Sequence, residues 1–169
     1  DETRKAYIEI ASLGFEFIDT PEEIARRVLE ERPTVVGFTS YVWNFEQLLE
    51  SVRLIKELDS SICIIFAGPQ VHTVEEELLT ANPGIDIIPT TFDPGEPILL
   101  ELVKRFVDGD SVESVPGIIY RNFGAVVRTD PNSPPLNFQD APSAYDLPGE
   151  VLFPEKDGRQ YYAIIEPSR

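Results

Sequence analysis

Five polar and aromatic residues follow a short apolar run near the start of the chain. The run is Val35-Val36-Gly37-Phe38, and the residues that come after it are Thr39, Ser40, Tyr41, Trp43 and Asn44. Hydroxyl groups hydrogen-bond amides or a phosphate, and aromatic rings stack on a flat macrocycle. The segment therefore predicts a binding site. A plain core position also fits a tryptophan in this place, and the sequence leaves both interpretations of Trp43 open.

A second apolar run ends in a loop that contains glycine. Residues 62–67 are followed by Gly68, Pro69 and Gln70. Gly68 lets a backbone approach a bulky ligand closely, although Gly-Pro is also an ordinary turn. His72 has no second metal ligand at a useful spacing, so we expect no metal site here. Because buried parallel strands deliver their carboxyl-terminal loops to one edge of a sheet, we expect both loops to line one ligand site.

Strands and helices alternate along the first 109 residues. In chain order, the patterns predict a helix over Thr3–Leu13, a strand over Phe15–Asp19, a helix from Pro21 to about Arg32, a strand over Thr34–Ser40, a helix over Glu46–Leu58, a strand over Ile62–Ala67, a helix over Val74–Ala81, a strand over Ile85–Ile88 and a helix over Glu96–Val107. This order predicts an α/β fold, a doubly wound Rossmann or flavodoxin-like parallel sheet with helices on both faces. Such a domain normally begins with a strand, which leaves open that the first strand is missing.

The pattern changes after Gly109. Two short strands, Val115–Arg121 and Ala125–Thr129, flank a turn with a glycine and predict a β-hairpin. The residues from 130 to 154 are rich in proline and have no periodicity, which is typical of an extended connector. We therefore expect a binding domain over residues 1–109, a hairpin extension over 110–130 and a proline-rich connector over 131–169.

Composition excludes several classes of function. The 169 residues include 30 acidic and 14 basic side chains, and the net charge of -16 would repel a nucleic acid. No apolar run approaches the roughly 18 residues of a membrane span, and no signal peptide is visible, so we expect a cytoplasmic protein. The single cysteine, Cys63, cannot build a disulfide framework or an iron-sulfur site within the chain. The sequence also lacks a nucleophile-base pair, a phosphate loop and a glycine-rich dinucleotide motif.

Several segments, in their order along the chain, resemble a known family. Arg32–Asn44 is similar to the family segment P-D-V-V-G-F-S-x-Y-x-W-N, and Phe66–Val71 is similar to its G-G-P-x-V segment. The similarity continues at Gly95-Glu96, at Gly117–Arg121 and at Ile165–Arg169. The chain thus resembles the N-terminal cobalamin-binding domain of B12-dependent radical SAM proteins, a family that includes methyltransferases and the anaerobic magnesium-protoporphyrin ester cyclase type.

The resemblance implies which residues hold the cofactor. It places the corrin ring and its side amides on Thr39, Ser40, Tyr41, Val42 and Trp43, the nucleotide loop on Gly68, Pro69 and Gln70, and the rim on Gly95 and Glu96. The chain departs from the family at Ala67, where glycine is frequent, and at the turn before Glu96, which lacks a first Gly-Glu pair. It has no Asp-x-His-x-x-Gly segment, so the resemblance implies base-off cobalamin with no histidine on cobalt.

The resemblance also implies a partner domain. Ile165–Arg169 is similar to the strand before the three-cysteine motif of the radical SAM barrel, so we expect that motif to be encoded next. The barrel would belong to the same parent chain, carry a [4Fe-4S] cluster and S-adenosylmethionine, and perform methyl transfer or a cyclase step, whereas this fragment alone is not catalytic. The rival interpretation is a flavodoxin-like interaction module that has lost cofactor binding, in keeping with the altered turn and the acidic composition.

Overall fold

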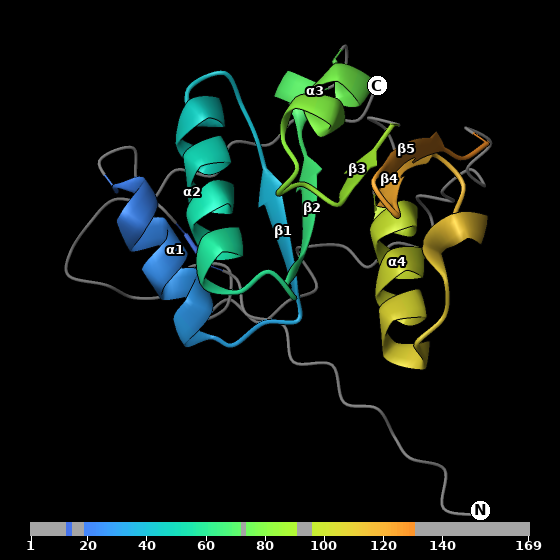
Figure 1. The fold of residues 1–169 in the computed structure, drawn as a ribbon, viewed down its shortest axis with the longest axis horizontal. Coiled ribbons are helices and arrows are strands. Elements are labelled where there is room, and N and C mark those ends of the chain that lie inside the picture. Colours follow the sequence, from blue (N-terminus) through green and yellow to red (C-terminus); the bar gives the residue numbers. More distant parts are fainter. Residues whose placement is uncertain (1–12, 15–18, 72–73, 91–95, 131–169) are drawn as a thin grey trace, which may run out of the picture. The chain divides into compact units, whose positions relative to one another are not determined.

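The structure is a computed structural model that describes residues 13–14, 19–71, 74–90 and 96–130. The chain divides after Pro135 into two units, and all the described residues belong to the first. Figure 1 shows the helices and strands of the first unit. The predicted helix over Thr3–Leu13, the predicted strand over Phe15–Asp19 and the connector over 131–169 fall almost entirely outside the described residues.

The first unit is built on a five-stranded sheet with the strand order β1-β2-β3-β4-β5. Three strands are parallel, namely β1 (Val35–Thr39), β2 (Cys63–Ala67) and β3 (Ile87–Pro89). They confirm the predicted α/β fold. The third begins two residues later than predicted, and just before it the Asp86 side chain accepts the N–H group of Ile64 in the neighbouring strand.

The predicted hairpin is confirmed as β4 (Ile118–Asn122) and β5 (Ala125–Arg128). It continues the same sheet, because β4 pairs antiparallel with β3 and Ile119 lies opposite Ile88. The sheet is therefore mixed, with parallel strands on one side and an antiparallel pair on the other (Figure 1).

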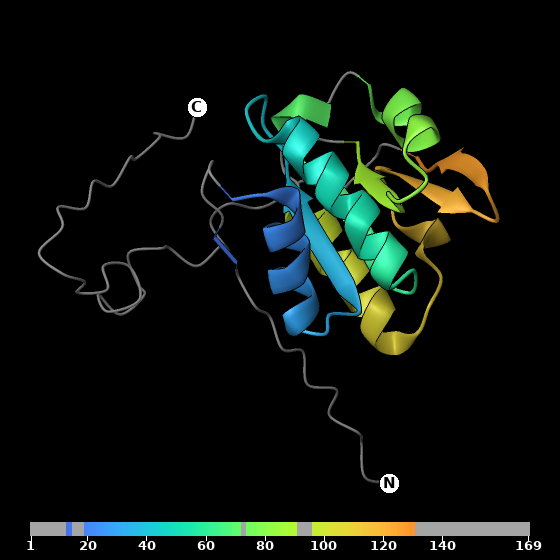
Figure 2. The same ribbon diagram turned by 60° about the vertical axis from the view of Figure 1, so that its left-hand side comes forward.

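Helices cover both faces of the sheet, as the sequence predicted. Helices α1 (Pro21–Glu30), α2 (Phe45–Leu58) and α3 (Glu75–Ala81) pack on one face, where Ile24, Ile55 and Phe38 belong to one buried cluster. Helix α4 (Glu96–Asp108) packs on the other face, where Leu102 and Ile65 belong to a second cluster. Figure 2 shows α2 and α4 on opposite sides of the strands. No helix among the described residues is long and apolar enough to cross a membrane.

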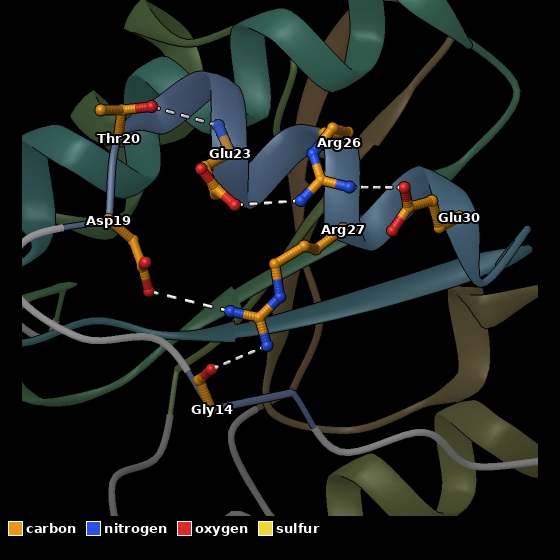
Figure 3. Close-up of polar contacts among 7 residues, drawn as sticks. All are labelled: Gly14, Asp19, Thr20, Glu23, Arg26, Arg27 and Glu30. Carbon is orange, nitrogen blue, oxygen red and sulfur yellow. Dashed lines mark hydrogen bonds and ion pairs between the residues drawn. The ribbon is translucent and has the colours of Figure 1, made fainter.

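Local chemistry fixes the start of α1. The Thr20 hydroxyl caps the helix by accepting the Glu23 N–H group at 3.2 Å, and Pro21 occupies the first turn. Arg27 then ties α1 to the chain before it, because its guanidinium donates to the Gly14 carbonyl at 3.1 Å and lies 3.8 Å from the Asp19 carboxylate (Figure 3). The two ends of the segment between residues 14 and 19 are thereby held on this helix.

A polar cluster closes the amino end of the sheet. The Asp86 carboxylate accepts hydrogen bonds of 2.7 Å from the Lys56 ammonium group and from the Ile64 backbone N–H. The same Lys56 group donates to the Ile62 carbonyl at 2.7 Å. Both side chains of this ion pair are mostly buried. The cluster therefore links α2 to the starts of β2 and β3.

Replacement of Asp86 by alanine should lower the free energy of unfolding by about 1.5 to 3 kcal/mol, the range for hydrogen bonds to charged groups, because two donors lose their acceptor. Glu57→Ala is the matched control, since the Arg53–Glu57 ion pair is exposed and solvent screens it, so its loss should change the free energy of unfolding much less. Urea unfolding followed by far-ultraviolet circular dichroism measures both. Equal losses in the two variants would contradict the structural role of Asp86.

Candidate functional site

The loops that follow β1 and β2 begin side by side. Thr39 lies opposite Ala67 in the parallel register, so the two strands end at the same level. The first loop leads into α2, and the second forms a short 3-10 helix, η1 (Pro69–Val71). The structure thus brings together residues 39–44 and 68–70, as the sequence predicted.

Ser40 joins the two loops. Its backbone N–H and its hydroxyl both donate to the Ala67 carbonyl, at 2.7 and 2.9 Å, and its own carbonyl accepts the Gln70 N–H at 3.4 Å. The residue is fully buried. Its hydroxyl therefore has a partner within the protein, and it fixes the loops rather than pointing at a ligand.

Gly68 lies directly against the backbone of Ser40. Its φ angle is +111°, and a Cβ atom on it would lie 2.3 Å from the Ser40 carbonyl oxygen. We predicted that a glycine here allows close approach of a ligand. The structure gives a different physical reason for the glycine, because the backbone that approaches it belongs to the neighbouring loop.

Tyr41 and Trp43 form an exposed aromatic pair. Their ring centroids are 4.6 Å apart and their planes differ by 4°, so the rings are stacked. Trp43 is 62% exposed, Val42 is 73% exposed and Tyr41 is 37% exposed. The core interpretation of Trp43 is therefore wrong. Three consecutive large apolar side chains lie at the carboxyl edge of the sheet with much of their surface open to solvent.

Asn44 holds the turn that carries this pair. Its Oδ1 atom accepts the Tyr41 N–H at 2.7 Å, and its Nδ2 atom donates to the Thr39 carbonyl at 3.3 Å. The sequence placed Asn44 in the loop but gave it no role. An asparagine just before a helix is the signal, since its amide serves as both donor and acceptor for nearby backbone groups.

The loop after β3, which contains the predicted rim residues, is described only in part. Thr90, after β3, donates its backbone N–H to the Gly117 carbonyl at 2.8 Å, which ties it to the hairpin side of the sheet. Gly95 and His72 lie outside the described residues, and Glu96 is described only as the start of α4. A role of Gly95 and Glu96 at the rim stays a prediction.

The two loops after β1 and β2 are electrically neutral. Residues 39–44 and 67–71 include no charged side chain, although the whole chain carries a net charge of -16. No group of three or more metal-ligating side chains is found in the part of the chain that the structure describes. Cys63 begins β2 at the opposite end of the sheet, and burial raises the pKa of its thiol to about 12. Its thiolate is therefore scarce near neutral pH.

Two concave surfaces lie away from this edge. An apolar groove of about 390 Å³ runs between α1 and α2, where Leu29, Leu54 and Leu58 line it. A second hollow of about 240 Å³ lies at the amino ends of β2 and β3, beside Lys56 and Asp86. Neither adjoins the loops after β1 and β2, whose exposed rings offer a flat surface instead.

Comparison with known proteins gives a family match and curated relatives. The model of the family "B12 binding domain" matches residues 3–103. A 2-(S-pantetheinyl)-carbapenam-3-carboxylate methyltransferase from Streptantibioticus cattleyicolor is 26% identical over 90% of this chain. The cobalamin-dependent radical SAM methyltransferase TokK from Streptomyces tokunonensis is 29% identical over 88% of this chain. The alignments cover only 22% of each of these two proteins.

Solved structures show the same fold. The cobalamin-dependent S-adenosylmethionine radical enzyme OxsB, with aqua-cobalamin and S-adenosylmethionine bound, matches with a TM-score of 0.60 at 20% identity. The match covers 73% of this chain and 17% of that one.

Replacement of Gly68 by alanine should destabilise the protein by at least about 1 to 3 kcal/mol, the cost of a strained backbone angle alone, with the overlap on Ser40 adding to it. Gly37→Ala is the control, because no described atom lies within 4 Å of a Cβ at that position and alanine suits a strand better than glycine. Urea midpoints of the two variants provide the measurement. A Gly68→Ala variant as stable as Gly37→Ala would contradict this role of Gly68, because the backbone of Ser40 would then move aside at little cost in free energy.

Proposed function

The chain belongs to the B12-binding domain family, whose cofactor is cobalamin, and we propose that it holds cobalamin on the neutral edge formed by the loops after β1 and β2. The single observation that carries this proposal is the exposed stack of Tyr41 and Trp43.

The stacked pair suits one face of a corrin ring. The outer face of this stacked pair is a flat aromatic surface, and Val42, the residue between the two in the sequence, is also exposed. Large exposed apolar side chains that are contiguous mark binding sites. A planar macrocycle that covers them removes this surface from water and stacks on the outer ring, which satisfies both the hydrophobic and the geometric preference of aromatic groups.

The remaining predicted contacts have separate roles in the proposal. The exposed Thr39 offers a hydroxyl to a corrin side amide, and Pro69 and Gln70 present their short helix to the nucleotide loop of the cofactor. Ser40 and Gly68 would not contact the cofactor, and their role is to hold the two loops together. When bound, cobalamin supplies cobalt-centred group transfer, and the protein's part is to fix its orientation and exclude water.

The cofactor is proposed to bind base-off, without a protein nitrogen on cobalt. The support is the sequence, whose single histidine is His72 and which contains no Asp-x-His-x-x-Gly segment. Electron paramagnetic resonance of the cobalt(II) form gives the test. Hyperfine splitting from a protein nitrogen would contradict this part of the proposal.

The parent protein is proposed to be a radical SAM methyltransferase. Both curated relatives are methyltransferases, and the chain spans about a fifth of their length. The domain would then hold its cofactor facing a radical SAM domain of the same parent chain, which carries a [4Fe-4S] cluster and S-adenosylmethionine. A cytoplasmic location, no nucleic-acid partner and a domain limit near residue 109 belong to the same proposal, and they rest on the sequence alone.

The alternative is an interaction module that docks a partner protein through the same exposed apolar side chains. The observation that favours it is the exposure of Tyr41, Val42 and Trp43, which a protein partner would also cover. The two functions differ in a simple measurement. After mixing with hydroxocobalamin and desalting, a module without a cofactor leaves the cobalamin in the small-molecule fraction. A cobalamin-binding domain instead carries the visible absorption spectrum of cobalamin in the protein fraction.

Trp43→Ala should weaken cobalamin binding by about 1 to 3 kcal/mol, or about 5- to 150-fold, because a large aromatic contact is lost. Its effect on the free energy of unfolding should stay below about 1 kcal/mol, since the side chain is mostly exposed. Equilibrium dialysis with hydroxocobalamin, read by absorbance, measures the affinity.

Phe123→Ala is the matched control for this experiment. Phe123 is a fully exposed aromatic residue in the turn between β4 and β5, so its loss should leave cobalamin affinity unchanged. Equal losses of affinity in the two variants, or no retention of cobalamin by the wild-type chain, would overturn the proposed site.

A further inference from the structure

The Asn44 side chain bonds both ends of the turn that carries the aromatic pair. Its carbonyl oxygen accepts from the Tyr41 N–H at 2.7 Å and its amide nitrogen donates to the Thr39 carbonyl at 3.3 Å. The Asn44 backbone adds an N–H bond of 3.2 Å to the Tyr41 carbonyl. Residues 39–44 are thereby closed into a compact turn by one residue.

Because the Asn44 side chain bonds this turn, it does not cap helix α2. Asparagine before a helix normally turns its side-chain oxygen to the first free N–H groups of that helix. Asn44 occupies the capping position of α2, and its backbone carbonyl accepts the Leu48 N–H at 2.9 Å, yet its side chain makes no capping bond. The amide serves the loop before it instead. A local departure from the arrangement that best stabilises a helix is typical of functional sites.

The stack depends on this turn. Tyr41 and Trp43 are separated by one residue, and Trp43 is mostly exposed while Tyr41 is partly exposed. Neither ring has a stacked contact with a third aromatic side chain among the described residues. The backbone that carries the two rings therefore contributes to their parallel orientation, and the Asn44 side chain bonds that backbone at Tyr41 and Thr39.

We propose that Asn44 is a positioning residue that keeps the Tyr41–Trp43 stack in the orientation that receives the corrin, an inference that rests on the proposed function. A loop that samples other shapes binds with an affinity reduced by the fraction of time it spends in the competent shape. Asn44 raises that fraction, and it does so without touching the cofactor.

The chemistry of the amide explains why asparagine is needed. The turn presents one N–H donor and one carbonyl acceptor, and only a side chain with both an acceptor and a donor satisfies the two. Aspartate keeps the acceptor but places a second oxygen against the Thr39 carbonyl. Alanine leaves both backbone groups without their partner.

The experiment compares Asn44→Ala and Asn44→Asp with Asn82→Ala. Asn82 is a matched control, since its amide donates one bond of 2.9 Å to the Leu78 carbonyl at the end of α3. Near-ultraviolet circular dichroism of the free proteins reports on the stack, and Trp43 is the only tryptophan in the chain. Both Asn44 variants should lose this signal while Asn82→Ala keeps it, at comparable urea midpoints.

Cobalamin affinity gives the second readout. Asn44→Ala should weaken binding by about 10- to 100-fold, as expected for two lost hydrogen bonds of the competent loop, and Asn82→Ala should not. In a Trp43→Ala background the further effect of Asn44→Ala should shrink to less than about threefold, because the residue acts through the ring. A purely structural role would weaken binding by the same factor in both backgrounds.

Distinct outcomes separate the two proposals. If the wild-type chain retains no cobalamin, the proposed function fails, and the dichroism of the free proteins alone decides whether Asn44 orders the stack. If Asn44→Ala does not fold, Asn44→Asp supplies the same measurements. An Asn44 variant that folds, keeps the aromatic dichroism signal and binds cobalamin as the wild type does would overturn the inference.

Discussion

The contact between Gly68 and Ser40 is the constraint on which the ligand edge depends. A positive φ angle at Gly68 and the absence of a Cβ atom let the second loop lie directly on the first. Ser40 can then direct both its N–H and its hydroxyl to the Ala67 carbonyl, and its buried position leaves no polar group unsatisfied. With the two loops joined, the residues that follow Ser40 must leave the sheet in one direction, and they bring their aromatic side chains out into solvent.

The two ends of the sheet differ in their chemistry. At the amino end, Lys56 and Asp86 form a mostly buried ion pair that also satisfies backbone groups of β2. At the carboxyl end, the loops after β1 and β2 contain only neutral side chains over residues 39–44 and 67–71. This separation suits a domain whose stability and ligand binding must not compete. The charges that stabilise the sheet lie far along the strands from the apolar and amide-bearing groups that would face a large neutral cofactor.

Local patterns predicted most of the elements, because apolar periodicity and caps act within a few residues. The spacing of Leu48, Val52 and Ile55 predicted α2, and the bounds of the three parallel strands were right to within two residues, whereas β4 begins three residues later than predicted. The pairing of β4 with β3 was beyond such patterns, since a turn signal fixes only the partner across the turn. The same limit applies to the site. The sequence placed Trp43 at the strand end but did not decide whether it is buried. It also singled out Gly68 but did not predict the contact of Gly68 with Ser40. Both features depend on residues that are distant in the sequence.

The size of the exposed patch bears on the choice between a cofactor and a protein partner. A specific protein interface takes roughly 20 to 30 residues on each side, with a core of several anchors. The exposed apolar side chains in the loop after β1 are Tyr41, Val42 and Trp43, Val74 is exposed in the connection after β2, and others, such as Leu58 and Phe123, lie on different elements. Three adjacent side chains, two of them stacked in parallel, match one face of a planar ring better than they match a broad protein surface. Because the two rings already contact each other in the free protein, their side chains would lose little further conformational entropy when a planar ligand binds.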